Sequence, residues 1–238
     1  MENGFKLETS TVWSFPDRGN WSTHKGDYPG NWSPYVPRNI ILRYSKENDL
    51  ILDQFIGSGT TIVEAKLLNR NIIGYDVNEK ALEISKNRIK NIMGNNSVEL
   101  LKRDARCLYD IKDNFIDLIC THPPYSNIIK YSKDIKEDLS LLSRKDFYIA
   151  MNQVAKECYR VLKKDKYCAI LMGDTRENGF IIPLGFDVMN IFINSGFKLK
   201  EIIIKEQHNC SSTNYWKEIS VKRNFYLIAH EYLFIFKK

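Results

Sequence analysis

A glycine-rich loop lies in residues 53–61, DQFIGSGTT, directly after an apolar segment. Gly57 and Gly59 can adopt backbone angles that are closed to other residues, and they let a ligand approach the main chain closely. The free N–H groups of the helix predicted to follow, together with Thr60 and Thr61, face the same point. The loop is therefore a candidate cofactor site.

Acidic residues follow each of the next two apolar segments. Asp76 ends the first of them, about twenty residues after the glycines, where a carboxylate can accept both hydroxyls of a ribose. Asp104 and Ala105 end the second, and ligands of open α/β sheets bind along the edge where the strands end. Together these features predict a nucleoside-bearing cofactor. A P-loop requires Gly-Lys-Ser/Thr, which does not follow here, so a P-loop is excluded. Ile62 and Val63 stand where a dinucleotide-binding fold has its third glycine, which argues against a pyrophosphate cofactor.

A second group of chemically useful residues is the run Thr121-His122-Pro123-Pro124-Tyr125. Two prolines cannot continue a strand ladder, so the chain must leave the sheet in a stiff turn. The turn brings an imidazole, the Pro123 carbonyl and an aromatic ring into one small space. The imidazole and the carbonyl could accept hydrogen bonds from the exocyclic amine of a nucleobase while the aromatic ring stacks on that base. The alternative is a rigid turn with incidental neighbours.

Short apolar segments alternate with amphipathic ones along most of the chain. The apolar segments predict strands over residues 50–55, 71–77, 98–105, 115–122, 167–174, 197–205 and 231–237. The amphipathic segments predict helices over 33–45, 60–69, 79–93, 144–162 and 184–195, the first with Ser33 as its N-cap and Pro34 at its first position. The alternation indicates an α/β fold with a doubly wound, mostly parallel seven-stranded sheet. No helix separates the last two strands, so we expect an antiparallel last strand.

Composition excludes several classes of protein. The chain has 238 residues, of which 43% are hydrophobic and 12% aromatic, with a formal charge of +6, so it is not a disordered chain. Its apolar runs are broken well before about 18 residues, and we expect no membrane span. The N-terminus lacks a signal pattern, which predicts a cytoplasmic protein. Five cysteines form no Cys-x-x-Cys pair, and no metal site is predicted.

The two motifs together resemble those of the S-adenosylmethionine-dependent amino-methyltransferases of DNA, which make N4-methylcytosine or N6-methyladenine. The family's glycine motif is Phe-x-Gly-x-Gly, here Phe55, Gly57 and Gly59. Its catalytic motif is (Asp/Asn/Ser)-Pro-Pro-(Tyr/Phe), here residues 122–125. The resemblance covers most of the chain. It implies a Rossmann-like class I methyltransferase, as a single domain over residues 1–238 with an irregular N-terminal arm at 1–32.

The resemblance also implies roles for the cofactor residues. Asp53 would lie near the amino group of S-adenosylmethionine, Asp76 at the ribose, and Asp104 with Ala105 near the adenine. The segment GNWSPYVPRN, which contains Ser33 and Pro34, would border the methionine end. The remaining residues of the expected site are those of the loop, namely Phe55, Gly57, Ser58, Gly59, Thr60 and Thr61.

At the catalytic turn, the resemblance implies that His122 and the Pro123 carbonyl hold the target amine, while Tyr125 stacks on a base flipped out of the duplex. His122 departs from the family pattern. Serine is typical of the N4-cytosine enzymes and aspartate of the N6-adenine enzymes, so a non-acidic residue slightly favours N4 of cytosine. Histidine accepts a hydrogen bond only through an unprotonated nitrogen. Activity is then expected to fall as the pH drops through the imidazole pKa, and a profile that is flat from about pH 5.5 to 8, with cofactor binding unchanged, would argue against His122.

The implied partner is double-stranded DNA. Members of the family carry a separate target-recognition region, and this chain has no spare residues for one. The candidate DNA-contacting segments are 126–140, 205–228 and the N-terminal arm with Arg18, His24 and Lys25, although each is also consistent with a solvated loop or with packing. A homodimer, a specificity subunit or a restriction endonuclease system are further expected partners. The alternatives are a methyltransferase for RNA base amines and a cofactor-binding subunit without catalysis.

Overall fold

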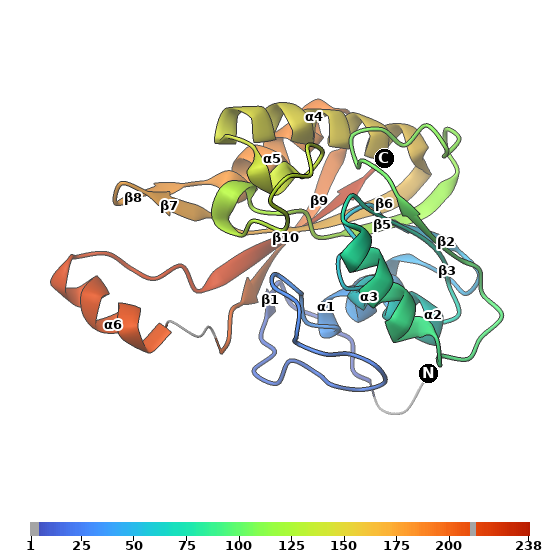
Figure 1. The fold of residues 1–238 in the computed structure, drawn as a ribbon, viewed down its shortest axis with the longest axis horizontal. Helices are drawn as coiled ribbons and strands as arrows, with labels where there is room; N and C mark the ends of the chain where they lie inside the picture. The colour runs from blue at the N-terminus through green and yellow to red at the C-terminus, as the bar shows by residue number, and fades with distance from the viewer. Residues whose placement is uncertain (1–4, 210–212) are drawn as a thin grey trace.

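The computed structural model describes residues 5–209 and 213–238 and shows a central sheet with helices on both faces (Figure 1). The strands are β1 (Val12–Trp13), β2 (Leu50–Asp53), β3 (Asn71–Asp76), β4 (Val98–Lys102), β5 (Ile116–Thr121), β6 (Leu162–Met172), β7 (Thr175–Glu177), β8 (Phe180–Ile182), β9 (Lys198–Glu206) and β10 (His230–Lys237). The helices are α1 (Tyr35–Tyr44), α2 (Thr60–Leu67), α3 (Glu79–Ile89), α4 (Arg144–Val161), α5 (Leu184–Asn194) and α6 (Thr213–Lys222), with 3-10 turns η1 (Ser126–Ile128) and η2 (Leu139–Leu141).

The sheet has the strand order β1-β9-β10-β6-β5-β2-β3-β4. All neighbouring strands are parallel except β10, which runs antiparallel to both β6 and β9. The mostly parallel α/β fold and the antiparallel last strand are therefore confirmed. The described sheet has eight strands, one more than predicted, because the two-residue β1 pairs with β9. The separate hairpin β7–β8 and helix α6 were also not predicted.

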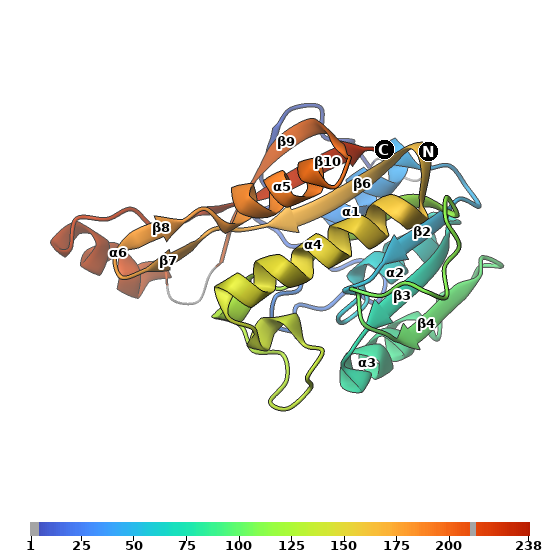
Figure 2. The same ribbon diagram turned by 90° about the horizontal axis from the view of Figure 1, so that it is seen from above.

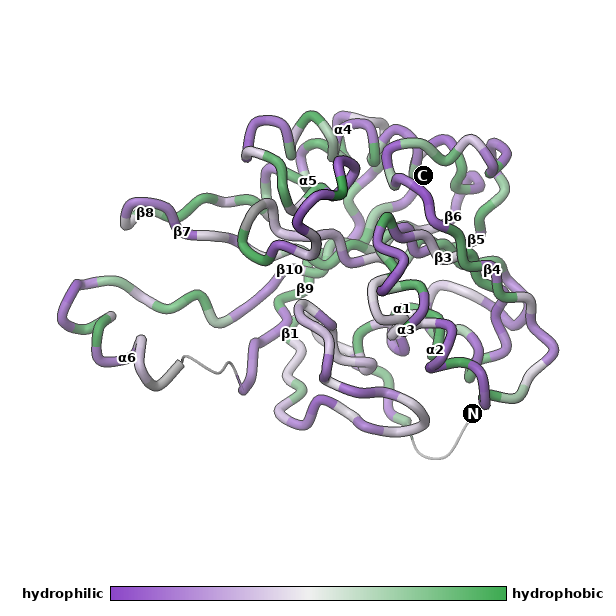
Figure 3. The backbone as a smooth tube through the Cα atoms, in the orientation of Figure 1, coloured by the Kyte–Doolittle hydropathy of each residue, from purple (hydrophilic) through white to green (hydrophobic). Residues whose placement is uncertain are grey.

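Two hydrophobic layers hold the helices to the sheet. Helices α4 and α5 cover one face, and α1, α2 and α3 cover the other (Figures 1 and 2). Successive residues of a strand point to opposite faces, so in β5 Ile119 joins the core under α4 while Leu118 and Cys120 join the core under α1 and α2. Burial on both faces explains the unbroken apolar runs of the central strands, which Figure 3 shows as hydrophobic colour through the middle of the molecule.

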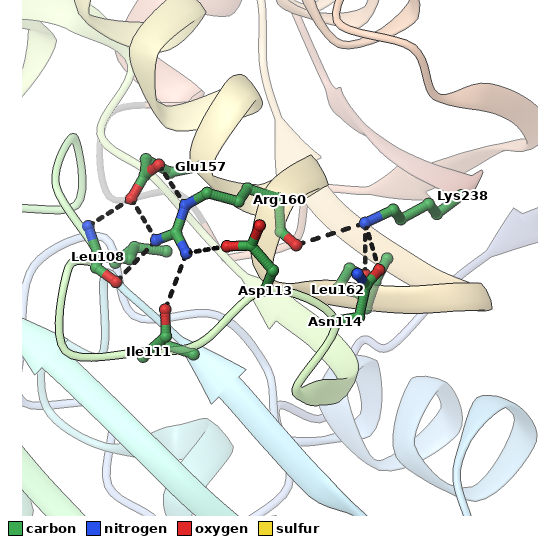
Figure 4. A network of polar contacts seen from close by, with 8 residues as sticks. All are labelled: Leu108, Ile111, Asp113, Asn114, Glu157, Arg160, Leu162 and Lys238. Carbon is green, nitrogen blue, oxygen red and sulfur yellow. Dashed lines mark hydrogen bonds and ion pairs between the residues drawn. The ribbon is translucent and has the colours of Figure 1, made fainter.

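The loop before β5 is anchored by Arg160 near the end of α4 (Figure 4). Its guanidinium donates to both carboxylate oxygens of Glu157 at 2.8 Å, to the carbonyls of Leu108 and Ile111 at 2.8 Å, and to Asp113 at 2.7 Å. These bonds use all five N–H donors of the side chain. They fix the amino end of β5, so the turn at its carboxyl end starts from a rigid strand.

Helix α1 begins one residue later than predicted, at Tyr35. Pro34 already has helical backbone angles, and the Ser33 hydroxyl accepts a hydrogen bond from the Tyr35 N–H at 3.3 Å. The N-cap residue is thus Pro34, one position after the predicted Ser33, and the Ser33 hydroxyl reaches the helix from the residue before the cap.

The N-terminal arm is fastened to α2 by Glu64, whose side chain is fully buried. Its carboxylate accepts hydrogen bonds from Trp21 Nε1 and His24 Nε2, both at 2.7 Å, and from Arg38 at 2.9 Å. Two residues of the arm and one of α1 thus converge on a single buried charge.

The described helices include none that is both long and apolar enough to span a bilayer. Of the cysteines, Cys120, Cys158 and Cys168 are buried free thiols and Cys107 is exposed, while Cys210 lies outside the described residues.

Replacing Glu64 by alanine is expected to destabilise the protein by about 3–5 kcal/mol, because it leaves buried polar partners uncompensated. Urea unfolding followed by circular dichroism measures the change. The matched control is Glu79→Ala, which removes the exposed ion pair with Lys102 and is expected to leave the unfolding midpoint unchanged. Equal shifts for the two variants would contradict the anchoring role of Glu64.

Candidate active site

A cavity that encloses about 770 Å³, the open solvent at its mouth included, lies at the carboxyl edge of β2 and β3. The predicted cofactor residues that line it are Asp53, Phe55, Gly57, Ser58, Thr60, Asp76 and Ala105. His122 and Pro124 of the catalytic turn line the same cavity. The structure thus brings together residues from four separate segments of the chain that the sequence assigned to one site.

The two glycines of the loop have different tasks. Gly57 has φ +50°, and a Cβ there would have no neighbour closer than 3.6 Å, so its small size leaves room within the cavity lining. Gly59 has φ +86° at the N-cap of α2, and a Cβ would lie 2.8 Å from Ser85 Oγ. Gly59 therefore allows the loop to pack on α3, and it does not line the cavity.

Asp53 is a buried carboxylate on the cavity wall. It accepts hydrogen bonds from the hydroxyls of Thr61 at 2.6 Å and Thr121 at 2.7 Å and from the Phe55 N–H at 3.1 Å. These donors are neutral, and the described residues place no cationic side chain in an ion pair with it. Burial raises its pKa to about 6. A cationic group such as the ammonium of an amino acid fits this position.

Asp76 ends β3 at the other side of the glycine loop. Its carboxylate accepts the N–H groups of Gly57 and Asn78, each at 2.9 Å, and burial raises its pKa to about 6. Each carboxylate oxygen has a second lone pair, so Asp76 can still accept the hydroxyls of a ribose. The residues present therefore fit S-adenosylmethionine: Asp53 would hold its ammonium group and Asp76 its ribose.

Four other predicted residues do not line the cavity. The Asp104 carboxylate points to Arg106, with which it forms an ion pair at 2.6 Å, and only its neighbour Ala105 reaches the wall. Thr61 acts through Asp53. Ser33 and Pro34 are buried at the start of α1, and the two preceding residues of the same segment, Asn31 and Trp32, line the cavity.

A second cavity, of about 1070 Å³, adjoins the first. Pro123 and Tyr125 of the catalytic turn line it together with Lys205 from β9 and Glu231 from β10. The residues that line both cavities are Gly30, Asn31, Trp32, His122 and Tyr131. The catalytic turn and the N-terminal arm therefore form a shared wall.

His122 is held within this wall by two aromatic side chains. The Trp32 ring stacks on the imidazole with a centroid distance of 5.4 Å and an interplanar angle of 25°. The Tyr125 hydroxyl lies 2.8 Å from His122 Nε2. Burial lowers the pKa of His122 to about 4, against the opposing effect of Glu231. The imidazole is thus neutral from pH 5.5 to 8. At saturating cofactor a neutral His122 predicts a flat activity profile in that range, so the expected fall in activity through the imidazole pKa is wrong.

The sequence interpretation missed Tyr131, Asn78 and Glu231 as site residues. Tyr131 belongs to the candidate DNA-contacting segment 126–140 and lines both cavities, and Asn78 lines the cofactor cavity just after β3. Glu231 is a charged residue at the start of an otherwise apolar strand, which is the one signal in the sequence that marks it.

Comparison with known proteins agrees with this geometry. A family model described as DNA methylase matches residues 2–87 and 116–238, which include the glycine loop, Asp76 and the catalytic turn. The chain belongs to this DNA methylase family.

Curated relatives of the chain include type II methyltransferases. M.HpaI of Haemophilus parainfluenzae is 30% identical over 159 residues, which cover 66% of this chain and 48% of that protein. M2.MboI of Moraxella bovis is 39% identical over 90 residues, 38% of this chain and 33% of that protein. The matched part of the chain thus spans between a third and a half of the length of these two relatives.

A solved structure of an S-adenosylmethionine-dependent methyltransferase from Methanosarcina mazei superposes on this chain with a TM-score of 0.58. The alignment covers 84% of this chain and 96% of that one at 18% identity. This likeness establishes the class I methyltransferase fold.

Cofactor affinity is expected to weaken as the pH falls through about 6, because Asp53 and Asp76 must be ionised to bind an ammonium and a ribose. Between pH 7.5 and 5 the Kd of S-adenosylhomocysteine should rise about tenfold for each carboxylate that takes up a proton. Isothermal titration calorimetry measures it. In Asp53→Asn the affinity should be lower at pH 7.5 and the pH dependence shallower. An unchanged pH dependence in that variant would exclude Asp53 from the site.

Proposed function

We propose that this methylase transfers a methyl group from S-adenosylmethionine to an exocyclic amine of a base in DNA. The observation that carries the proposal is the shared wall: a cavity suited to the cofactor and a second cavity meet at His122. When bound, S-adenosylmethionine supplies an electrophilic methyl group. The second cavity is the site proposed for the target base.

The residues of the catalytic turn would position the amine. His122 and the Pro123 carbonyl accept its two hydrogens, which favours a tetrahedral nitrogen with a free lone pair. The ring of Tyr125 stacks on the base and offsets part of the cost of base flipping, by about 1–3 kcal/mol. Positioning of this kind supplies a large share of the rate in group transfer.

N4 of cytosine is the target we favour over N6 of adenine. The support is the residue type at position 122, since His122 is neutral at physiological pH and aspartate is typical of the adenine enzymes. An RNA base amine is the alternative substrate.

Helix α6 is the part of segment 205–228 that we propose contacts DNA. It stands away from the sheet together with the hairpin β7–β8 (Figures 1 and 2). Lys217, Lys222 and Arg223 are exposed on and after it, suited to phosphates, and Trp216 is 43% exposed. Lys205, at the start of the segment, is instead ion-paired with Glu231 at 2.8 Å.

Of the other two candidate segments, only some residues are free to contact DNA. In segment 126–140, Lys130 and Lys133 are exposed beside Tyr131. In the N-terminal arm, His24 is buried on Glu64 and Arg18 donates to the Trp32 carbonyl at 2.8 Å, so these two residues pack inward. Partnership with a second copy, a specificity subunit or a restriction endonuclease stays a prediction, as does the cytoplasmic location.

The decisive assay incubates the protein with labelled S-adenosylmethionine and either unmethylated DNA or RNA, followed by digestion and mass spectrometry of the nucleosides. We expect N4-methylcytosine from DNA. N6-methyladenine would correct the target, and a methylated RNA base would correct the substrate. No labelled nucleoside from either nucleic acid, with the cofactor bound, would contradict the proposal.

Tyr125→Ala is expected to lower methylation at least about tenfold, since the stacking energy is lost, with little change in cofactor affinity. Tyr125 lines the second cavity and not the cofactor cavity. Tyr109→Ala, which removes a 68% exposed ring, is the control and should behave as wild type. Equal losses of methylation and of cofactor binding in Tyr125→Ala would mark it as a core residue.

Replacing Lys222 and Arg223 by alanine is expected to weaken DNA binding and to reduce the slope of log Kd against log salt by about two, because two phosphate contacts are lost. Fluorescence anisotropy over a salt series measures this slope. The control is the pair Lys112→Ala and Lys164→Ala, two exposed lysines at the amino edge of the sheet. An identical slope in both double variants would exclude α6 from the DNA interface.

A further inference from the structure

Four side chains form a continuous row of hydrogen bonds across the second cavity. Lys205 Nζ donates to Glu231 Oε2 at 2.8 Å, and the Tyr125 hydroxyl donates to Glu231 Oε1 at 2.7 Å. The same hydroxyl lies 2.8 Å from His122 Nε2. The row begins on the sheet and ends at the imidazole of the shared wall.

The direction of these bonds follows from the chemistry of their ends. An ionised carboxylate can only accept hydrogen bonds. The single proton of the Tyr125 hydroxyl is therefore committed to Glu231, and toward His122 the phenolic oxygen can only accept. It follows that Nε2 carries the proton of the neutral imidazole. Nδ1, for which the described residues offer no hydrogen-bond partner, keeps its lone pair.

We propose that Glu231 is a positioning residue that sets the tautomer of His122, with the proton on Nε2 and with Nδ1 as the acceptor for the target amine. The role of Nδ1 toward the amine rests on the proposed function; the tautomer itself does not. An imidazole in the opposite tautomer would present an N–H to an amine that must also donate.

The protonation states agree with this direction. Burial acts to raise the pKa of Glu231, but the adjacent Lys205 and the hydrogen bonds from Lys205 and Tyr125 outweigh it and lower the pKa. Burial and the Glu231 charge raise the pKa of Tyr125, so its hydroxyl keeps its proton. The side chain of Glu231 is 9% exposed and that of Lys205 14% exposed, so water competes little for these bonds.

The tautomer is measured directly by long-range ¹H–¹⁵N correlation spectra of the uniformly labelled full chain at pH 7.5. The His122 signal is assigned by its loss in His122→Asn. We expect a pyrrole-like shift for Nε2 and a pyridine-like shift for Nδ1. A protonated Nδ1, or a mixture of the two tautomers, would overturn the proposal.

The Glu231→Gln variant makes a sharper test because it should reverse the row. Lys205 can only donate, so it holds the amide oxygen and turns the amide N–H₂ toward Tyr125. The Tyr125 hydroxyl then donates to Nε2, and the proton of His122 moves to Nδ1. The matched control is Glu206→Gln, which changes a carboxylate one residue along β9 from Lys205 that lies 3.5 Å from His208 Nε2. It should keep the wild-type tautomer, and an unchanged tautomer in Glu231→Gln would refute the proposal.

Tyr125→Phe gives an independent test, because it removes the hydroxyl and keeps the ring. The tautomers of His122 should then mix, and a retained single Nε2–H tautomer would contradict the role of the row. In the methylation assay, Glu231→Gln should lower kcat about tenfold or more with an unchanged KM for S-adenosylmethionine. If no nucleic acid is methylated by the wild type, the proposed function fails, while the spectra still decide whether Glu231 sets the tautomer.

Discussion

The hydrogen bond from the Tyr125 hydroxyl to Glu231 ties the catalytic turn to the last strand of the sheet. This bond can form because β10 is antiparallel to its neighbours. The first residues of an antiparallel strand lie at the edge of the sheet where the parallel strands end. Glu231 is thereby paired with Lys205 across the two strands. It also lies within reach of the turn that begins at His122, 109 positions earlier in the sequence. The position of His122 between the two cavities depends on this bond and on the Trp32 ring stacked against it.

The parallel core and its cofactor loop were predictable because they follow from local rules. Apolar runs buried on both faces of a sheet are recognisable as strands, and β2, β3 and β5 lie where those runs stand. The glycines mark a turn with positive φ, and Asp53 and Asp76 follow from the edge at which parallel strands end. The prediction for Asp104 used the same rule, which locates a backbone position but not the direction of a side chain. Arg106 forms an ion pair with the Asp104 carboxylate, which therefore does not line the cavity.

Other features depend on contacts between distant segments or on signals that are easily passed over. Strand β1 has two residues, too few for a periodic pattern, and exists only through its pairing with β9. The hairpin β7–β8 turns at Asn178 and Gly179, both with positive φ, so the Asn-Gly pair was a readable hairpin signal. Glu231 and Tyr125 are 106 residues apart, and no local pattern in the sequence connects them.

In the proposed function, a cofactor and a base meet at the wall formed by His122 and Trp32. A crystal structure of the protein with S-adenosylhomocysteine would show whether the cofactor lies on its side of this wall. We predict the amino group of the ligand at Asp53, its ribose hydroxyls at Asp76 and its sulfur directed at the shared wall beside His122. A ligand bound with its sulfur turned away from His122, or bound outside this cavity, would contradict the claim.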